Sequence, residues 1–429
     1  MKKFNFKQTM TSTCAAFKKG ANFVWSKIKA FTLNRNAAAW FFFLMIATTV
    51  SFFVYVLVRG TETFMSPYFR GGKDMFMDYF NSVRDVSLGE GVYTVRHVIY
   101  PPMANLIFLV FLRLMPKGYV ATQFADRQTW VNYPASMFSV LLFLVVPMVI
   151  LALLCAANFK GAPTYKKAFG LFSIINYPVL YMVERGNILI YTVLATAVFV
   201  FYYDSESKVK REIALIALAF AFSLKIYPAI LGAVLLVDKR YKDAIRCAIY
   251  ALVLLILPSF FFGGPVCLKW MLDNIRSFSG NRSETSGNIW FWCSFAVYLL
   301  AVFVQKDKTK LLIFGVAVLR VFPALASMYA WSFFLPVLCL FIGEQTKMNV
   351  KNAAYFFLMV FPFVFAVGLG KEDYARGADM LLHILLSLCI LDTAWETYRA
   401  ISNKRKGKKT MVAEGEGDVQ PEPVAEVAE

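Results

Sequence analysis

The familiar motifs of soluble catalysis are missing from this chain of 429 residues. It contains no GxGxxG or Walker A loop to cradle phosphates, no GxSxG nucleophile and no HExxH zinc motif. Its only histidines are His97 and His383, so a histidine-based metal site is not expected. The seven cysteines are scattered without CxxC spacing, which favours neither a zinc site nor a disulfide framework. The chemistry of this protein therefore has to come from other residue types.

Charge is scarce as well, since 17% of residues are charged and 59% are hydrophobic. The apolar residues gather in runs that approach the roughly 20 residues needed to cross a bilayer. The clearest runs are 39–58, 137–159, 244–262, 289–304, 353–369 and 381–395. Alternation of outward and inward residues, typical of a transmembrane barrel, is absent. The sequence predicts an all-α polytopic membrane protein, in which 39–58 is an uncleaved anchor.

The net charge of +18 is concentrated outside the apolar runs. Basic residues crowd the segment 1–38, recur in short loops near 208–211, 239–242 and 306–310, and follow the last run at 404–409. This is the pattern of loops kept in the cytoplasm, where anionic lipid headgroups are the natural partner. Nucleic-acid binding is therefore not expected. We expect a basic cytoplasmic tail at 1–38, a multi-span domain at 39–398 and a disordered cytoplasmic tail at 399–429.

The number of spans comes to about twelve or thirteen, and two cytoplasmic tails require an even number. The doubtful segments are 100–115, which could be a short or re-entrant helix, and 213–237, which could be one span or a hairpin. We prefer the hairpin, because basic loops then flank both arms on the inside. Two long polar segments, 59–99 and 263–288, then lie on the non-cytoplasmic side.

Ionisable residues near or inside the apolar runs are the candidates for function, because such groups are costly at membrane depth. Asp74 and Asp78 lie four residues apart in an aromatic-rich stretch after the first run. Arg185 and Asn187, preceded by Glu184, interrupt two apolar segments, and Lys225 and Arg320 interrupt two more. In the hairpin topology all of them fall on, or toward, the non-cytoplasmic side.

An acid opposite several cations suits group transfer from a lipid phosphate. A carboxylate can act as general base toward a hydroxyl nucleophile. Arginine and lysine suit a phosphate, and tyrosines such as Tyr227 and Tyr329 suit sugar faces. Each residue also has a structural interpretation: Lys225 at a helix end could extend to the interface, Arg320 could pair between helices, and Asn187 could cap a helix.

The order of these residues resembles the polyprenol-phosphate-sugar-dependent glycosyltransferases of the GT-C class, above all glycosyltransferase family 87, a mannosyltransferase-like group. The resemblance spans roughly residues 39–345. Its elements are an Asp in the first outer loop, a Gly and Tyr before a Tyr-Pro-Pro, an Arg-Gly-Asn, a Lys-x-Tyr-Pro and a late Arg with a Ser-x-Tyr-x-Trp. Here they match Asp74, Gly89 or Gly91 with Tyr93, Tyr100–Pro101–Pro102, Arg185–Gly186–Asn187, Lys225 with Tyr227 and Pro228, Arg320, and Ser327 with Tyr329 and Trp331.

The resemblance implies an inverting transferase of GT-C architecture in a bacterial inner membrane. Its donor would be a polyprenyl-phosphate sugar, with mannose or another hexose favoured, and its acceptor a lipid-linked or envelope glycan on the non-cytoplasmic face. Asp74 is the favoured base and Asp78 the alternative, with Lys225, Arg185 and Arg320 on the departing phosphate. No cofactor is required, although the need for a divalent cation stays open. The rival hypotheses are a flippase or other transporter of lipid-linked glycans, and a non-catalytic membrane scaffold.

Overall fold

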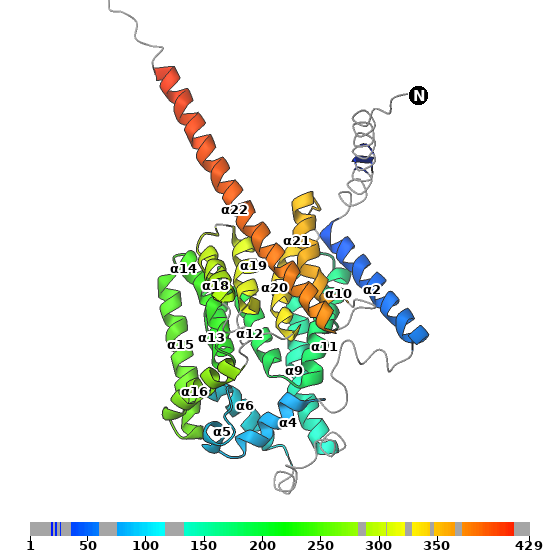
Figure 1. Cartoon of the computed structure of the whole chain (residues 1–429), viewed down its shortest axis with the longest axis vertical. Coiled ribbons are helices and arrows are strands. Elements are labelled where there is room, and N and C mark those ends of the chain that lie inside the picture. The colour runs from blue at the N-terminus through cyan, green and yellow to red at the C-terminus, as the bar shows by residue number, and fades with distance from the viewer. Residues whose placement is uncertain are drawn as a thin grey trace, which may run out of the picture.

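The chain forms an all-helical bundle in this computed structural model (Figure 1). The structure describes residues 36–59, 75–115, 133–281, 289–305, 307–321, 328–343, 347–364 and 371–415, with Lys19, Asn22, Phe23 and Ser26. Within these ranges there is no strand, only an isolated bridge between Asn36 and Lys347. The helices are α2 (Ala37–Arg59), α4 (Met77–Val86), α5 (Gly91–Thr94), α6 (Pro102–Leu112), α9 (Pro134–Asn158), α10 (Pro163–Phe172), α11 (Tyr177–Arg185), α12 (Leu189–Tyr202), α13 (Lys208–Leu224), η2 (Tyr227–Leu231), α14 (Gly232–Val237), α15 (Tyr241–Ser259), η3 (Phe260–Phe262), α16 (Val266–Asn281), α18 (Ile289–Val302), α19 (Lys308–Val321), η5 (Met328–Phe333), α20 (Phe334–Phe341), α21 (Val350–Val360), η6 (Phe361–Phe363) and α22 (Lys371–Gly415).

Several of these helices have the length and composition of membrane spans. In the described part of the chain, four helical segments are long and apolar enough to cross a bilayer: Ala37–Tyr55, Pro134–Asn158, Tyr241–Phe262 and Arg376–Asn403. Shorter apolar helices of 10–17 residues accompany them. The predicted all-α polytopic class is therefore confirmed.

Several short helices change between 3-10 and α geometry along their length. η2 continues directly into α14, η5 into α20, and α21 into η6, whereas residues 173–176 separate α10 from α11. Irregular backbone at membrane depth is tolerated only where protein buries it or where it lines a cavity. The 3-10 segments are buried in this way, because η2 packs against α13 and α19, and η5 packs against α11 and α12. The interrupted helices thus meet inside the bundle, where a polar site can form.

The chain reverses direction at Lys225, in agreement with the hairpin interpretation of 213–237. α13 ends at Leu224, Lys225 adopts an extended conformation, and η2 begins two residues later. η2 packs back against α13, and α14 continues it along α15. Lys225 therefore lies at the turn of a helical hairpin.

The segment 100–115 forms only a short helix. α6 covers 11 residues and packs against α4, α13 and α15. It lies beside α4 and α5 at one end of the bundle, which we call the α4 end (Figure 1). The start of α2 and the far end of α22 lie toward the opposite end. This arrangement fits the short or re-entrant interpretation of α6.

The α9–α10 contact shows how closely the helices approach one another. A Cβ atom on Gly170 of α10 would lie 2.8 Å from the carbonyl oxygen of Ala152 and 2.9 Å from the Cβ of Ala156, both on α9. Small residues at such contacts let two backbones pack tightly in a membrane, where van der Waals contact is a main source of stability. Gly170 therefore has no room for a side chain.

We expect Gly170→Ala to separate α9 from α10 and to lower the free energy of unfolding by about 1–3 kcal/mol, the usual cost of overpacking. Gly232→Ala is the matched control, because nothing lies within 4 Å of a Cβ at that position. Thermal unfolding of the purified variants in detergent measures both. A Gly170 variant as stable as the Gly232 variant would contradict the packing argument.

Candidate active site

Asp78 projects from the first turn of α4, whose other face is anchored in the core. Tyr79, Phe80 and Val83 are buried, and the Tyr79 hydroxyl lies 2.5 Å from the Ser139 Oγ of α9. A carboxylate in the first turn is favoured by the partial positive charge of a helix N-terminus. The helix thus holds Asp78 at a fixed position near the junction of α11 and α12.

The start of α4 is tied directly to the end of α11. Phe76, just before α4, has a left-handed conformation with φ of 54°, and its N–H donates to the Glu184 carbonyl at 2.6 Å. Left-handed backbone is costly for a bulky residue and persists only where its surroundings enforce it. The contact between α4 and the end of α11 must therefore be favourable enough to offset the strain in the Phe76 backbone.

Gly186 makes this contact possible. It ends α11 in the left-handed conformation with φ of 64°, which glycine adopts without penalty. A Cβ at this position would lie 2.8 Å from the Cβ of Tyr79 and 3.2 Å from the Cα of Phe76. Only glycine fits here, and the residues on either side of it, Arg185 and Asn187, are thereby brought to α4.

Both oxygens of the Asp78 carboxylate are held by this turn. Arg185 Nη2 donates to Oδ1 at 2.5 Å, and Asn187 Nδ2 donates to Oδ2 at 2.6 Å. Hydrogen bonds to an ionised carboxylate are short and strong. The Asp78 side chain keeps 18% of its surface exposed and that of Arg185 14%, so the pair stays reachable. Asn187 Oδ1 also accepts from the N–H of Leu189, the first residue of α12, at 2.9 Å, so the same side chain contacts the start of α12 and the site.

Lys225 faces the same carboxylate from the turn between α13 and η2. Its Nζ lies 4.0 Å from the centroid of the Tyr100 ring, and it interacts electrostatically with Asp78. Among the residues that the structure describes, the Lys225 ammonium group makes no hydrogen bond and no ion pair, and only its backbone N–H is bonded, to the Ala221 carbonyl at 3.0 Å. Its positive charge is held by an aromatic face, which is a weaker partner than a carboxylate.

Lys310 shows what a purely structural lysine looks like in this bundle. It is buried, with its Nζ 2.7 Å from Asp392 and 2.8 Å from Glu396, both on α22. Lys351 joins the same two acids from α21. Such a network cross-links helices, whereas Lys225 has an aromatic ring in place of an ion-pair partner.

Three of the predicted tyrosines gather around these charges. Tyr100 hydrogen-bonds with Asn187 and interacts electrostatically with Asp78, Arg185 and Tyr329. Tyr227 interacts with both Tyr100 and Tyr329. Segments from five parts of the sequence therefore meet at one site: α4, the residues before α6, the α11–α12 junction, the α13–η2 turn and η5.

Other residues support this site without having been predicted. Tyr181 of α11 stacks on Tyr329 with ring centroids 5.9 Å apart. Asn105 donates to the Tyr93 hydroxyl at 2.9 Å, and that hydroxyl donates to the Tyr100 carbonyl at 2.9 Å. Asn274 of α16 donates to the carbonyls of Tyr93 and Val98. A lone asparagine in an apolar run is the only sequence feature that could have pointed to these roles.

Two predicted residues cannot be placed. Asp74 lies outside the described residues, and Arg320 belongs to α19 but its side chain lies outside the described part. Among the described residues, no three His, Cys, Asp or Glu side chains group closely enough to hold a metal ion.

A second acid of α4, Asp85, has its own arginine partners. It lies seven residues after Asp78, with Arg84 at 2.9 Å and Arg96 at 3.6 Å. Burial raises the pKa of the Asp85 carboxyl above its ordinary value, and the two arginines oppose this effect. Asp85 is therefore a comparable ion pair on the same helix, with different cations.

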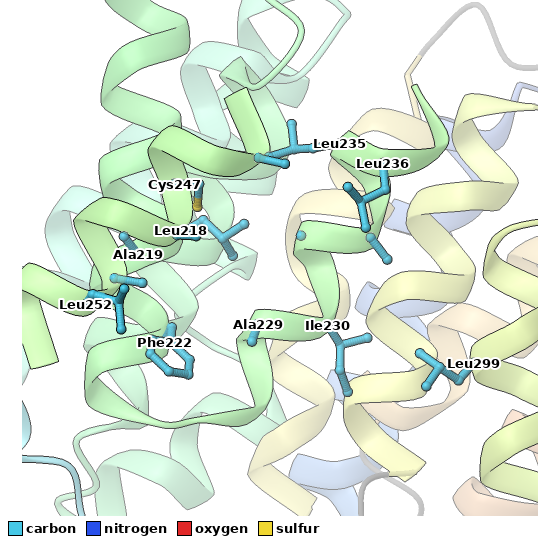
Figure 2. A pocket seen from close by; sticks show the side chains of 15 residues that line it. Leu218, Ala219, Phe222, Ala229, Ile230, Leu235, Leu236, Cys247, Leu252 and Leu299 are labelled. Atoms are coloured by element: carbon cyan, nitrogen blue, oxygen red, sulfur yellow. The ribbon is translucent and has the colours of Figure 1, made fainter. Parts of the chain in front are cut away.

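An apolar groove of about 560 Å³ lies elsewhere in the same part of the bundle (Figure 2). Phe222 and Ala229, which come before and after Lys225 in the chain, lie at one end, and Leu235 and Leu236 lie at the other. The walls come from α13, η2, α14, α15 and α18, and Cys247 contributes the only sulfur among the lining residues. The size and lining of the groove suit a hydrocarbon chain.

The fold and site define a polytopic membrane protein with a charged, tyrosine-lined centre and an apolar groove. A family model described as glycosyltransferase family 87 matches residues 98–343, more than half of the chain, and the protein belongs to that family. No curated protein and no solved structure matches the chain significantly. The expected family is thus confirmed, and the protein is a membrane glycosyltransferase, which implies a sugar donor and an acceptor. The match begins after α4, so Asp78 joins the site from outside the matched range.

We expect Gly186→Ala to displace Arg185 and Asn187 from Asp78 and to reduce transferase activity by at least about tenfold, since it adds a clash to the left-handed strain. Gly89→Ala is the control, because Gly89 has φ of 57° but nothing within 4 Å of its Cβ. It should cost only the strain, about 1 kcal/mol of stability. Activity and thermal unfolding, measured on both variants, separate the two effects, and equal activities would contradict the role of Gly186.

Proposed function

We propose that this protein is an inverting glycosyltransferase that takes a sugar from a polyprenyl-phosphate donor. The observation that carries the proposal is the meeting of Asp78 with Arg185, Asn187 and Lys225. A donor of this class has a sugar, a phosphate and a long hydrocarbon chain. The site offers a base and two cations, and the groove lined by Phe222 and Ala229, on either side of Lys225 in the chain, offers room for the hydrocarbon.

Asp78 is the proposed general base. The acceptor hydroxyl oxygen attacks the anomeric carbon, a new C–O bond forms, and the bond from that carbon to the phosphate oxygen breaks. The hydroxyl proton passes to the Asp78 carboxylate, and the polyprenyl phosphate leaves with the electron pair of the broken bond. Attack opposite the leaving phosphate inverts the anomeric centre. The support for Asp78 is its contact with Arg185, Asn187 and Lys225, and Asp74 lies outside the described part of the chain.

The cations are proposed to stabilise the departing phosphate. Negative charge grows on the phosphate oxygens as the bond breaks, and preorganised positive groups at that place lower the barrier. Lys225 suits this role because its present partner is the Tyr100 ring, which an anion can replace. Arg185 supplies the fork that binds two oxygens at once. Arg320 stays a further candidate on α19.

The apolar groove is proposed to hold the isoprenoid chain. Its volume of about 560 Å³ lies in the range of ligand pockets, and its lining is almost entirely aliphatic (Figure 2). A chain seated there would place its phosphate by the Lys225 turn. Tyr100, Tyr227 and Tyr329 are left to contact the sugar, with a hexose such as mannose favoured.

The active site is proposed to face the non-cytoplasmic side of a bacterial inner membrane. The basic loops next to α13, α15 and α19 lie away from the α4 end, and such loops stay in the cytoplasm (Figure 1). The acceptor is then a lipid-linked or envelope glycan presented at the α4 end.

The test is sugar transfer by the full-length protein in proteoliposomes that contain a radiolabelled polyprenyl-phosphate mannose and a glycolipid acceptor. Formation of labelled glycolipid, with loss of donor, supports the proposal. Movement of the intact donor across the bilayer without transfer would instead favour a transporter. Neither event with any hexose donor would favour a scaffold.

We expect Asp78→Asn to lower kcat by about 10²–10⁴-fold, the usual contribution of a general base, while donor affinity is retained. The amide keeps the shape of the carboxylate but cannot accept the proton at neutral pH. Asp74→Asn is the paired comparison, because it alters the other acid of the same segment. Asp78→Asn with near-normal kcat, together with an inactive Asp74→Asn, would move the base to Asp74.

We expect Ala248→Trp to raise the KM for long-chain donors by about tenfold or more, because the indole fills the groove and removes apolar contact. The KM for a donor with a short prenyl chain should change little. Ile249→Trp is the control, since Ile249 is the next residue on α15, is 52% exposed and does not line the groove. Equal KM values for the two variants with long-chain donors would place the chain elsewhere.

A further inference from the structure

The segment that carries Tyr100 has little regular structure of its own. Residues 97–99 belong to no helix, and Tyr100 is followed by Pro101 and Pro102, which have no N–H group to donate. His97 has a left-handed conformation with φ of 53°, which is costly for a residue other than glycine. Such a segment keeps one shape only where its surroundings fix it. The position of the Tyr100 ring, which lies against Lys225, therefore depends on contacts from other parts of the fold.

Two of these contacts come from the neighbouring helices α5 and α6. The Tyr93 hydroxyl of α5 donates to the Tyr100 carbonyl at 2.9 Å. Asn105 of α6 donates to the same hydroxyl at 2.9 Å, and both side chains are buried. Tyr93 thus fixes the backbone of the residue whose ring lies over Lys225.

The third contact comes from α16, in the second long polar segment of the chain. Asn274 Nδ2 donates to the carbonyl of Tyr93 at 2.9 Å and to that of Val98 at 3.2 Å, across 181 and 176 residues of sequence. The amide nitrogen of asparagine carries two N–H groups, so it can serve two carbonyls at once. The two carbonyls lie on either side of His97 in the chain. Asn274 therefore bridges the segment around its left-handed residue.

α16 is anchored firmly enough to hold this segment in place. Its residues Cys267 and Met271 are buried, and the helix packs against α5. Asp273, next to Asn274, lies on the exposed side, where its carboxylate is 3.4 Å from Arg276 of the same helix. The two neighbouring polar residues thus differ, since only Asn274 reaches the segment before α6.

We propose that Asn274 is a positioning residue, which acts through Tyr93 and Tyr100 to hold Lys225 where the donor phosphate departs. The effect on catalysis rests on the proposed function, whereas the effect on the Tyr100 ring does not. A positive group lowers the barrier only while it is held where negative charge develops. Without Asn274 the segment relaxes, the ring leaves Lys225, and the ammonium group loses its fixed position. The donor still binds through its hydrocarbon chain, so the loss falls on kcat.

A fluorine label on Tyr100 tests the contact with Lys225 directly. 3-Fluorotyrosine is placed at position 100 of the full-length protein in nanodiscs, and its ¹⁹F resonance is recorded by NMR. Lys225→Met removes the cation from the ring face and defines the resonance of a ring without it. Asn274→Ala should shift the resonance in the same direction. Asp273→Ala is the matched control on the adjacent, exposed position, and it should leave the resonance unchanged.

The transfer assay measures the consequence for catalysis. We expect Asn274→Ala to lower kcat by about tenfold or more, as a small misplacement of a catalytic group does, with the donor KM within about twofold of wild type. Asp273→Ala should keep the wild-type values of both. Asn274→Asp separates hydrogen bonding from packing, because a carboxylate has the size of the amide but cannot donate to a carbonyl. It should be as defective as Asn274→Ala, whereas a role in packing alone would leave it like the wild type.

The outcomes separate this proposal from the proposed function. An unshifted resonance in Asn274→Ala, or an equal shift in Asp273→Ala, would overturn the positioning role and leave the proposed function standing. An unshifted resonance in Lys225→Met would also overturn it, because the ring would then lie away from the cation. A wild-type protein that transfers no sugar, while Asn274→Ala still shifts the resonance, would overturn the proposed function alone.

Thermal unfolding checks that each variant is folded. If Asn274→Ala is unstable, Tyr93→Phe replaces it, because this change removes only the hydroxyl that donates to the Tyr100 carbonyl. The resonance should again shift in the direction of Lys225→Met. An unchanged resonance in a folded Tyr93→Phe protein would overturn the proposal in the same way.

Discussion

The contact of Asp78 with Arg185 and Asn187 is the interaction on which the rest of this site depends. Charged groups with little exposed surface are tolerated when their partners are close and well oriented, because the attraction then offsets the loss of hydration. The contact joins segments that lie 107 residues apart in the chain. The left-handed backbone at Phe76 and Gly186 follows from it, since both residues lie where α4 and the end of α11 approach each other. Removal of Arg185 would take its ion-pair partner from the Asp78 carboxylate, so we expect this contact to matter for the site as well as for the shape of the turn.

Lys310 and Lys225 show that lysines within one membrane bundle can have different surroundings: Lys310 forms ion pairs between helices, and Lys225 lies against an aromatic ring. Lys310 lies between Asp392 and Glu396 and links α19 to α22, so its positive charge is neutralised by ion pairs that stabilise the fold. Lys225 lies at a break between helices, beside an aromatic ring and near a carboxylate that Arg185 already binds. The local sequence does not separate the two cases, because each lysine simply adjoins an apolar segment. The difference arises from the partners that the fold brings to each of them.

Much of the fold and part of the site could be predicted from the sequence. Long uncharged runs define membrane spans on physical grounds, and costly polar residues such as Lys225 and Asn187 drew attention to the site that they now share. Periodicity does not rank Asp74 and Asp78, because two acids four residues apart on a helix share a face. The family resemblance favoured Asp74, which begins the aromatic-rich segment, and Asp74 lies outside the described residues. Tyr181, Asn105 and Asn274 were missed because their roles depend on contacts between distant segments. The short α6 was left open for a similar reason, since composition does not reveal where a chain turns back.

The distance along the chain between Asp78 and its partners also has a consequence for biosynthesis. Because translation proceeds from the N-terminus, Asp78 leaves the ribosome before Arg185 and Asn187, so its carboxylate lacks these two partners during that interval. Asp78 lies on α4, a helix at the end of the bundle and not in a long apolar span, so its carboxylate can stay hydrated until α11 has been made. The site can then close only after α11 has entered the membrane. Assembly of the candidate site thus has to follow the insertion of α11, and the hydrogen bond from Phe76 to the Glu184 carbonyl forms only after that step.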